Sequence, residues 1–243
     1  MRSQYFGFAT IFIFQNRVFE HEQQTGTNLI EQVFDNLTAI QLKQLSIKTD
    51  IQRTDSTMIS SNIRKYSRAQ LLIEVLIRLE RILDETDIQS IGQHLQEYLK
   101  TGSGKYVYAL KSSELPRELE KLGKVYHAIH CEIDGSEKYL NKKEFANFVR
   151  VYKEHFVVVG QEISPKPTED LHSGMLQSPD DQDATYRKKK EQQSKGFTIN
   201  GTETASPDNR VQLITDIAVN PNNIDDTIIL GDRIDKLWGR PPN

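Results

Sequence analysis

Apolar residues recur at helical spacing in the first part of the chain. Residues 28–34 carry apolar side chains at positions i, i+3 and i+4, and Asn28 stands three residues before Glu31, as in a capping box. This pattern predicts a capped amphipathic helix. Thr38 with Gln41 predicts the start of a second, short helix.

A longer helical block is expected over residues 67–156. Ser67 with Gln70 forms another capping box, and the run LLIEVLIRLERIL at 71–83 is apolar over most of a helix circumference. We therefore expect a well-buried helix there. Further helices are expected over 87–99, after Ser113, and after a cap at Asn141 with Glu144.

Two other parts of the chain have the pattern of strands. Residues 46–59 are rich in Ile, Thr and Ser, which allows a strand with Asp55 near its end. Residues 197–204 and 210–219 alternate between apolar and polar, and the letters SPDN between them predict a turn, so we expect a β-hairpin. A last helix is expected over residues 224–237.

The segment 160–195 differs from both kinds of region. It contains three prolines, many polar residues and almost no periodicity, which is typical of a linker or a long functional loop. Three acidic residues, Asp180, Asp181 and Asp183, precede the basic run 187–190. Within the segment a run of negative charge is therefore followed by a run of positive charge.

Residues 5–14 read YFGFATIFIF, a short apolar run near the start. The run is too short to cross a bilayer, which takes about 20 residues. Polar residues follow it at 15–17, where a signal peptide would have a small-residue cleavage site. We expect a buried core segment rather than a targeting sequence, and no membrane partner.

Composition narrows the class of protein. The 243 residues fit one or two domains, and a formal net charge of −3 excludes a uniformly basic nucleic-acid binder but leaves room for a local basic patch. The single cysteine, Cys131, excludes a disulfide framework and fits a reducing compartment, most simply the cytoplasm. We expect Cys131 to be a buried structural residue rather than a nucleophile.

Several familiar chemical motifs are missing. The sequence has no GxGxxG, GxxxxGK[ST], HExxH or GxSxG. His127 and His130 can share a helix face, but two histidines without a nearby third ligand are weak evidence for a metal site. The segment 134–145 lacks the Gly and Glu that a calcium loop needs, so we interpret Asp134 and Gly135 as a turn.

Asp55 is the most informative acidic residue, because Ser56 and Thr57 follow it on a predicted strand. Carboxylate and hydroxyl oxygens suit Mg²⁺, and a strand can hold a ligand in a fixed direction. The same residue types also occur at turns and helix caps. The local sequence alone leaves both interpretations open.

A resemblance to a known family begins at this segment. QRTDSTMISSNIR at 52–64 resembles the first-aspartate segment of DDE-type insertion-sequence transposases. In the same order, YVYALK, LQSPDDQDATYRKKK and the stretch from KGFTINGTET to NNIDDTIIL also resemble transposase sequence, so the likeness extends over residues 5–230. The resemblance rests on all of these pieces occurring in the same order as in that family.

The resemblance implies an RNase H-like core and phosphoryl transfer at DNA ends. In that family two or three carboxylates hold two Mg²⁺ (or Mn²⁺) ions, which activate a nucleophile and stabilise the leaving oxygen. Asp55 matches the first catalytic aspartate and would be a metal ligand. The family's second aspartate and its glutamate have no match before Asn243. The resemblance therefore implies a truncated transposase that is inactive alone and does not hold the ions tightly.

Four other acidic residues are candidates to replace the missing carboxylates. Glu203 lies on the second predicted core strand, and Asp180, Asp181 and Asp183 precede the hairpin. Because catalysis needs a fixed geometry, we favour a solvent-facing strand residue and a polar loop as the interpretation of these positions.

Basic residues around Asp55 and in the run at 187–190 are candidates for DNA contact. Lys and Arg give salt-sensitive affinity for phosphates, and a tyrosine beside them can stack on a base. The candidates are Arg53, Arg64, Lys65, Arg68, Tyr186, Arg187, Lys188, Lys189 and Lys190. Arg78 and Arg81 are expected to be ordinary surface residues.

The expected fold is α/β and rich in helix. It is a partial RNase H-like core of about three strands with a large helical insertion between the first strand and the hairpin. The expected parts are an N-terminal helical segment at 1–45, the first core strand at 46–66, the helical insertion at 67–159, a polar linker at 160–195, and the core hairpin with its following helix at 196–243.

The expected function is that of a DDE-type transposase acting on transposon ends. The alternative is a non-catalytic DNA-binding or inhibitory remnant that pairs with a full-length transposase. A third hypothesis is a chain that no longer folds stably, because an exposed sheet edge favours aggregation.

Overall fold

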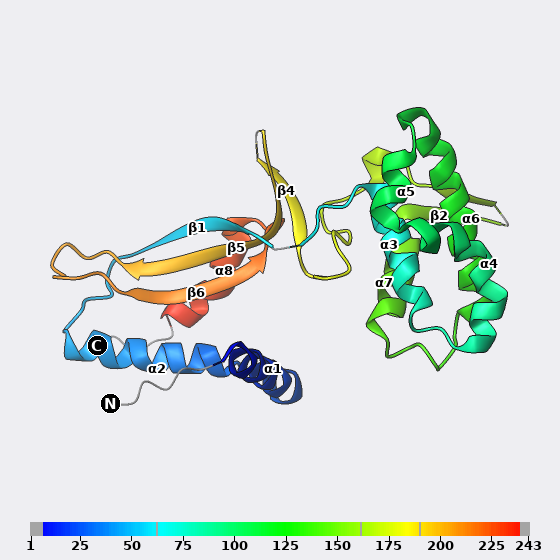
Figure 1. The fold of residues 1–243 in the computed structure, drawn as a ribbon. Helices are drawn as coiled ribbons and strands as arrows, with labels where there is room; N and C mark the ends of the chain where they lie inside the picture. Colours follow the sequence, from blue (N-terminus) through cyan, green and yellow to red (C-terminus); the bar gives the residue numbers. More distant parts are fainter. Residues whose placement is uncertain (1–6, 62, 161, 190, 239–243) are drawn as a thin grey trace. The chain divides into compact units, whose positions relative to one another are not determined.

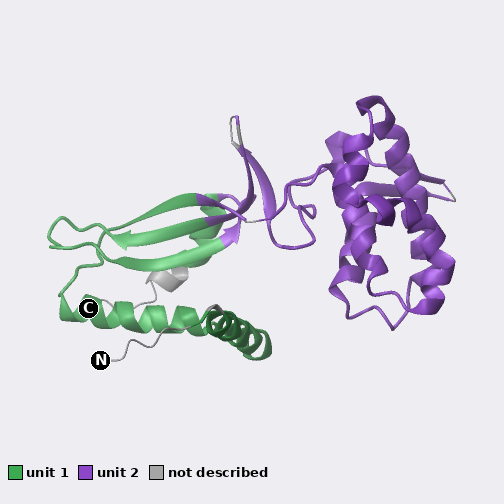
Figure 2. Ribbon diagram, viewed as in Figure 1, with its two compact units in different colours: residues 1–57, 199–219, 226–243 green, residues 58–198, 220–225 purple. Residues whose placement is uncertain are grey.

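The computed structural model describes residues 7–61, 63–160, 162–189 and 191–238, and its fold is mixed α/β (Figure 1). The chain forms two compact units (Figure 2). Unit 1 consists of residues 1–57, 199–219 and 226–243, and unit 2 consists of residues 58–198 and 220–225. The mixed α/β class expected from the sequence is confirmed.

Unit 1 begins with two helices, α1 (Phe8–Thr25) and α2 (Leu29–Gln44). Asn28 caps α2 as predicted, because its side-chain oxygen accepts the N–H of Glu31 at 2.9 Å. The separate helix expected at Thr38 is wrong, since α2 is continuous through that residue and Thr38 is buried. A mid-helix Thr inside an otherwise amphipathic pattern therefore marks a packed position here.

The apolar run of α1 is not a core segment. Ile11, Phe12, Ile13 and Phe14 have exposed fractions between 49% and 62%. The reason is geometric: the run is apolar on every side of the helix, whereas a single neighbouring helix can cover only one side. The expectation of a buried element is wrong for its described part, and positions 5 and 6 of the run lie outside the described residues.

Four strands form one sheet in which β5 (Gln192–Thr204) pairs with β1 (Gln52–Ser60), β4 (Thr185–Lys189) and β6 (Ile214–Pro221). β1 is antiparallel to β5. In unit 1 the N–H of Ala205 donates to the carbonyl of Ile51, and in unit 2 the N–H of Ser61 donates to that of Lys195. The predicted pairing of the two later strands is confirmed, and Asp55 lies in the middle of β1 rather than near its end.

One glycine in unit 2 is required by this close approach of strands. Gly196 has φ +149°, and a Cβ on it would lie 2.3 Å from the carbonyl oxygen of Ile59 and 2.5 Å from the nitrogen of Ser61. No side chain fits there. The close approach of the two strands thus explains why a glycine occupies position 196, before the aromatic residue at 197.

In unit 1 the two faces of the sheet differ. The covered face contains Thr202, Thr204 and Asp216, all at most 4% exposed. α8 (Asp226–Trp238) is bonded to this face, because Ser56 Oγ donates to Asp226 Oδ2 at 3.0 Å and Arg233 pairs with Asp216. The opposite, open face carries Arg53, Asp55, Glu203, Ile217 and Val219. Ile217 and Val219 are 43% and 60% exposed.

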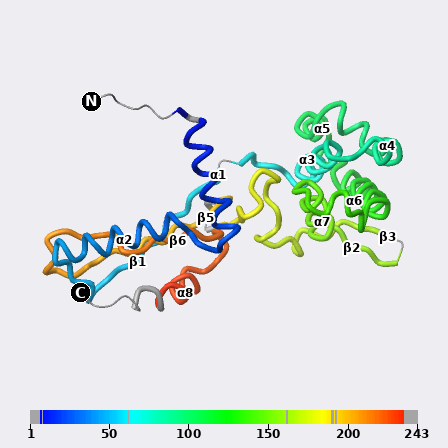
Figure 3. The backbone as a smooth tube through the Cα atoms, turned by 90° about the horizontal axis from the view of Figure 1, so that it is seen from below, coloured from blue at the N-terminus to red at the C-terminus, as the bar shows by residue number. Residues whose placement is uncertain are grey.

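Unit 2 contains the helical block. Its helices are α3 (Arg68–Glu80), α4 (Glu85–Thr101), α5 (Ser103–Ala109), α6 (Leu115–Ile133) and α7 (Lys143–His155), with two short 3-10 turns at Ser112–Glu114 and Thr168–Asp170. A hairpin of β2 (Phe156–Val159) and β3 (Glu162–Pro165) lies beside α6 and α7 (Figure 3).

The core of unit 2 is built around α3. Leu72, Ile73, Leu76 and Leu79 are completely buried, as the apolar circumference predicted. Tyr126 and Phe148 stack with centroids 5.0 Å apart. Ser67 caps α3 by accepting the N–H of Gln70, whereas α7 has no side-chain cap, so the cap expected at Asn141 is wrong.

The segment expected as a polar linker at 160–195 contains β3, β4 and the start of β5. Met175 and Leu176 within it are 3% and 1% exposed. Its acidic residues have partners as well: Asp180 pairs with Arg78 at 2.8 Å, and Asp181 accepts a hydrogen bond from Ser61. Arg78 is therefore bound in an ion pair rather than an ordinary surface residue.

Candidate functional site

Asp55 is presented on the open face of the sheet in unit 1. Its Oδ1 accepts the N–H of Ser56 at 2.8 Å, and its side chain is exposed. The side-chain hydrogen bonds of Thr54 with Thr202 and of Arg53 with Glu203 show which residues of β1 and β5 lie opposite each other. That register puts Gly201 opposite Asp55. A Cβ on Gly201 would meet nothing within 4 Å, so there is open space beside the carboxylate.

The other carboxylates do not gather around Asp55. On the same face, Glu203 accepts a hydrogen bond from Arg53 Nε at 2.6 Å. Asp226 belongs to the covered face, where it contacts Ser56. In the described part of the chain no group of three or more His, Cys, Asp and Glu side chains is arranged to hold a metal ion. The described residues therefore do not fit a two-metal clamp, and Asp55 can supply only one ligand of such a site.

The predicted basic residues near Asp55 have three different environments. Arg53 is exposed and paired with Glu203. Arg64 and Lys65 are exposed in the extended segment that precedes α3. Arg68 is half-buried, and its Nη1 and Nη2 donate to the carbonyls of Lys166 and His155, each at 2.8 Å. Arg68 thus joins the start of α3 to the end of α7 and is not a surface cation.

The basic run at 187–190 begins on a strand rather than in a loop. Strand alternation puts Tyr186 and Lys188 on one side of β4 and Arg187 on the other. Arg187 Nη1 donates to the carbonyl of Asn222 at 3.2 Å, and Lys188 is exposed. β4 ends at Lys189, and Lys190 lies outside the described residues. Among the described side chains of the run, Arg187 and Lys188 therefore lie on opposite sides of the strand.

Unit 2 nevertheless brings some of these residues together at two adjoining cavities. The larger, of about 500 Å³, is lined by Arg68 and Tyr186, which are far apart in the sequence, and by Lys195. The smaller, of about 290 Å³, is lined by Tyr186, Arg187 and Lys188, and also by one acidic residue, Asp225. Ser173 lines both. Tyr186 and Ser173 thus mark the place where the two cavities meet.

Sequence reasoning missed three residues of the larger cavity. His155 and His172 line it together with Lys195. Lys195 has a local signal, since it directly precedes Gly196 at the point where β4 and β5 pair. The two histidines have no such local signal in the sequence. His155, for example, lines the cavity only because α7 packs against α3.

Four further residues from the sequence analysis lie outside these cavities. The Nδ1 of His127 is hydrogen-bonded to the hydroxyl of Tyr152 at 2.7 Å, and His130 lies 3.7 Å from Asp134. Cys131 is exposed on α6, so its expected burial is wrong: it falls on the outer side of an amphipathic helix. Gly135 has φ +74°, as expected for a turn.

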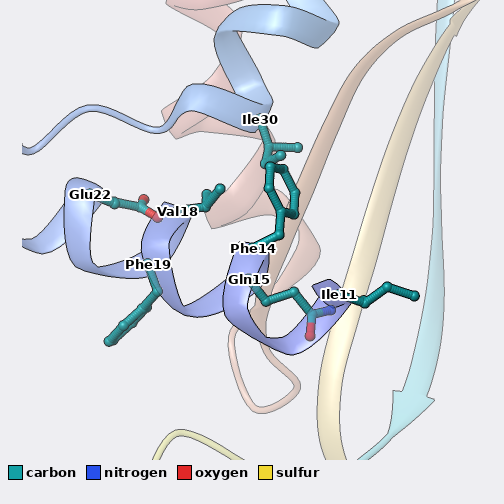
Figure 4. Close-up of a pocket in the computed structure, with 7 residues that line it drawn as sticks. All are labelled: Ile11, Phe14, Gln15, Val18, Phe19, Glu22 and Ile30. Atoms are coloured by element: carbon teal, nitrogen blue, oxygen red, sulfur yellow. The ribbon is translucent and has the colours of Figure 1, made fainter. Parts of the chain in front are cut away.

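Unit 1 contains an apolar groove of about 410 Å³ between α1 and α2. Phe14 and Val18 lie toward Ile30 of α2, whereas Phe19 points away (Figure 4). Glu22 is the charged residue of its lining. A groove without basic residues does not suit DNA. Among the described residues, no helix is both long and apolar enough to cross a membrane.

Comparisons with known proteins do not indicate a family or a fold for this chain. A scan of the chain against protein-family models and searches of curated proteins and of solved structures gave no match.

Proposed function

We propose that this chain binds DNA and is a transposase of the DDE type, with a partial RNase H-like core. The observation that carries DNA binding is the gathering of Arg68, Tyr186, Arg187, Lys188 and Lys195 at two adjoining cavities of unit 2. Cations that contact phosphates give affinity, and a tyrosine among them can stack on a base.

The transposase assignment draws support from the sheet. β5 lies between β1 and β6, and α8 follows β6 directly. That is the order which the sequence resemblance implies for the first three core strands and the next helix. Asp55 is exposed on β1, at the position that matches the family's first catalytic aspartate.

Strand transfer by this chain alone is not part of the proposal, because Asp55 supplies one ligand where the family uses two or three carboxylates. Mg²⁺ or Mn²⁺ would bind Asp55 weakly. The DNA partner would be a transposon end. The cytoplasm suits the protein, since the exposed thiol of Cys131 is stable in a reducing compartment.

A second candidate function is inhibition by pairing with a full-length transposase. The open face of unit 1 exposes Ile217 and Val219, while the covered face buries threonines. Apolar surface of this kind suits a protein partner rather than DNA. A pull-down with full-length transposase, compared between wild type and a Val219→Asp variant, tests this alternative: loss of capture in the variant supports it, and equal capture contradicts it.

DNA binding is tested by fluorescence anisotropy with a labelled duplex over a series of salt concentrations. The Arg187→Ala/Lys188→Ala double variant removes two phosphate contacts, so the slope of log K against log salt should become shallower by about 1.8. The matched control is Arg117→Ala/Lys124→Ala, which removes the same charges from exposed positions of α6. No binding at low salt, or equal slopes for both variants, would contradict the proposal.

The role of Asp55 is tested by Mn²⁺ binding, followed by electron paramagnetic resonance. We expect one weak site that is lost in Asp55→Asn. Asp50→Asn is the matched control, because Asp50 also accepts the N–H of the following residue, at 3.0 Å. Binding that survives Asp55→Asn would remove this residue from the proposed site.

A further inference from the structure

The larger cavity of unit 2 lies where five parts of the chain meet. The start of α3, the end of α7, the segment around residues 168–177, and the β4 and β5 strands all contribute to its lining. Every lining residue belongs to unit 2. Its volume of about 500 Å³ is in the range of cavities that hold small organic ligands.

The ionisable groups of the lining are all cationic or neutral. Arg68 and Lys195 carry positive charge, His155 and His172 contribute imidazoles, and Tyr66 and Tyr186 contribute phenols. No Asp or Glu is among the lining residues. Such a set attracts an anion, because its charges act at short range and partial burial reduces their screening by solvent.

Several of these groups are buried without a hydrogen-bond partner. The hydroxyl of Tyr66, the Nε of Arg68 and both ring nitrogens of His155 have none within the described structure. Tyr66 is 8% exposed and His155 is 5% exposed, so solvent does not replace the missing partners. Buried donors of this kind are normally satisfied, and unsatisfied ones indicate a missing ligand or ordered water.

The donors are also held in place. The two other nitrogens of Arg68 are fixed by carbonyls, which leaves the guanidinium in one orientation. The backbone N–H of Tyr186 donates a hydrogen bond to the carbonyl of Ser173, which fixes the backbone of Tyr186 beside the segment that contains Ser173. Arg68 is the first residue of α3, a helix of 13 residues whose positive dipole end adds to the same field.

The pKa values of His155 and Lys195 agree with cations that lie close together. Burial, followed by the charges of Arg68, Lys166 and His172, lowers the pKa of His155 to about 4. Burial and the charge of Lys65 lower the pKa of Lys195. Burial raises the pKa of Tyr66, which therefore remains a donor at neutral pH.

We propose that this cavity binds the phosphate group of a nucleotide, with Tyr66, Arg68, His155 and Lys195 as donors to the phosphate oxygens. A tetrahedral anion with several acceptor oxygens matches donors that come from several directions. The cavity is larger than one phosphate needs, and Tyr186 lies on its wall, where it can stack on the attached base.

The phosphate has two possible sources, a DNA strand or a free nucleotide. The assignment of the phosphate to a DNA strand rests on the proposed function. The binding of a phosphate group in this cavity does not depend on that function. Binding of inorganic phosphate without binding of any oligonucleotide would therefore assign the site to free nucleotides, uphold the cavity and reject the DNA function.

The test uses isothermal titration calorimetry of the full chain with inorganic phosphate and thymidine 5′-monophosphate. Tyr66→Phe and Lys195→Gln should each weaken binding about tenfold or more, since each removes a hydrogen bond to a charged group. Tyr108→Phe and Lys105→Gln, at exposed positions of α5, should leave it unchanged.

A thermal melt separates binding from folding. Tyr66→Phe removes a hydroxyl that has no partner, so its midpoint without ligand should equal or exceed that of the wild type. Oligonucleotides with and without a 5′-phosphate then identify the source. Tighter binding of the phosphorylated strand indicates a strand end, and equal binding that competes with phosphate indicates an internal phosphodiester. Absence of phosphate binding, or equal binding by the two variants and the wild type, overturns the proposal.

Discussion

Unit 1 and unit 2 distribute their apolar residues in opposite ways. In unit 2 the helices enclose a closed core, in which Leu72, Ile129 and Phe148 are fully buried. In unit 1 the sheet buries threonines, Asp216 and Asn200, while Ile217 and Val219 are exposed. Unit 2 therefore has the packing of a self-sufficient fold, whereas unit 1 has few buried apolar side chains and its sheet is held in part by polar bonds.

Core truncation is the strongest way to test this difference. Phe148→Ala should cost about 4 kcal/mol of unfolding free energy, because it leaves a cavity in the core of unit 2. Phe14→Ala in unit 1 removes a ring that is 57% exposed and should change stability by about 0.5 kcal/mol or less. Urea denaturation measures both. Equal losses would show that the two units are packed alike.

The ion pair between Arg233 and Asp216 in unit 1 allows a second test of this difference. Arg233 bonds Asp216 and Glu31 at 2.9 Å or less, and the side chain of Asp216 is 3% exposed. Arg233→Met should cost about 3 kcal/mol because it leaves a buried carboxylate without this partner. Amide exchange along β6 measures the loss.

The control for this prediction is Lys48→Met, which breaks the exposed pair with Asp208 in the same unit. It should have a much smaller effect, because solvent screens an exposed ion pair. If Arg233→Met has no larger effect than Lys48→Met, the polar bonds do not hold unit 1 together.

The pH dependence of unit 2 gives a graded test. The pKa of His155 is lowered from 6.5 to about 4 by burial and by Arg68, Lys166 and His172. As the pH falls, His155 is protonated in the unfolded chain before it is protonated in the folded chain. The free energy of unfolding should therefore decrease below pH 6.5, by at most about 3 kcal/mol in total, and should level off near pH 4.

Melting curves of His155→Gln and His94→Gln check the origin of this change. The fall between pH 6.5 and about 4 should disappear in the first variant and persist in the second. A fall of the same size in both variants would place its cause elsewhere.

Helix caps should give the smallest difference. Asn28→Ala and Ser67→Ala each remove an oxygen that accepts a first-turn N–H, worth about 1 kcal/mol. In unit 2 the loss should lower the global unfolding free energy, because α3 is central to the core. In unit 1 it should appear mainly as faster amide exchange in α2. Identical global losses would contradict the contrast between the units.

Local patterns predicted much of this architecture. The caps at Asn28 and Ser67, the burial of α3 and the pairing of the late strands are all encoded within a few residues. The exposure of α1 was not predictable in this way, because it depends on how many neighbours cover an all-apolar helix. The same holds for Cys131, whose exposure follows from the face of α6 that it occupies.

The candidate site was predictable only in part. Arg68 and Tyr186 were singled out as separate basic and aromatic positions, but their meeting at one cavity depends on contacts between distant segments. Arg68 also has a packing role through the carbonyls of His155 and Lys166, which no spacing rule reveals. His155 was missed because its neighbours in the sequence form an ordinary helix end.

We propose that unit 2 contacts DNA through the groups around its two cavities. Hydrogen–deuterium exchange of the full chain, with and without a short DNA duplex, tests it most directly. We predict slower exchange in residues 64–68, 172–177 and 185–189, with α1 and α2 unchanged. Protection confined to α1 and α2, or no protection anywhere at saturating DNA, would contradict the account.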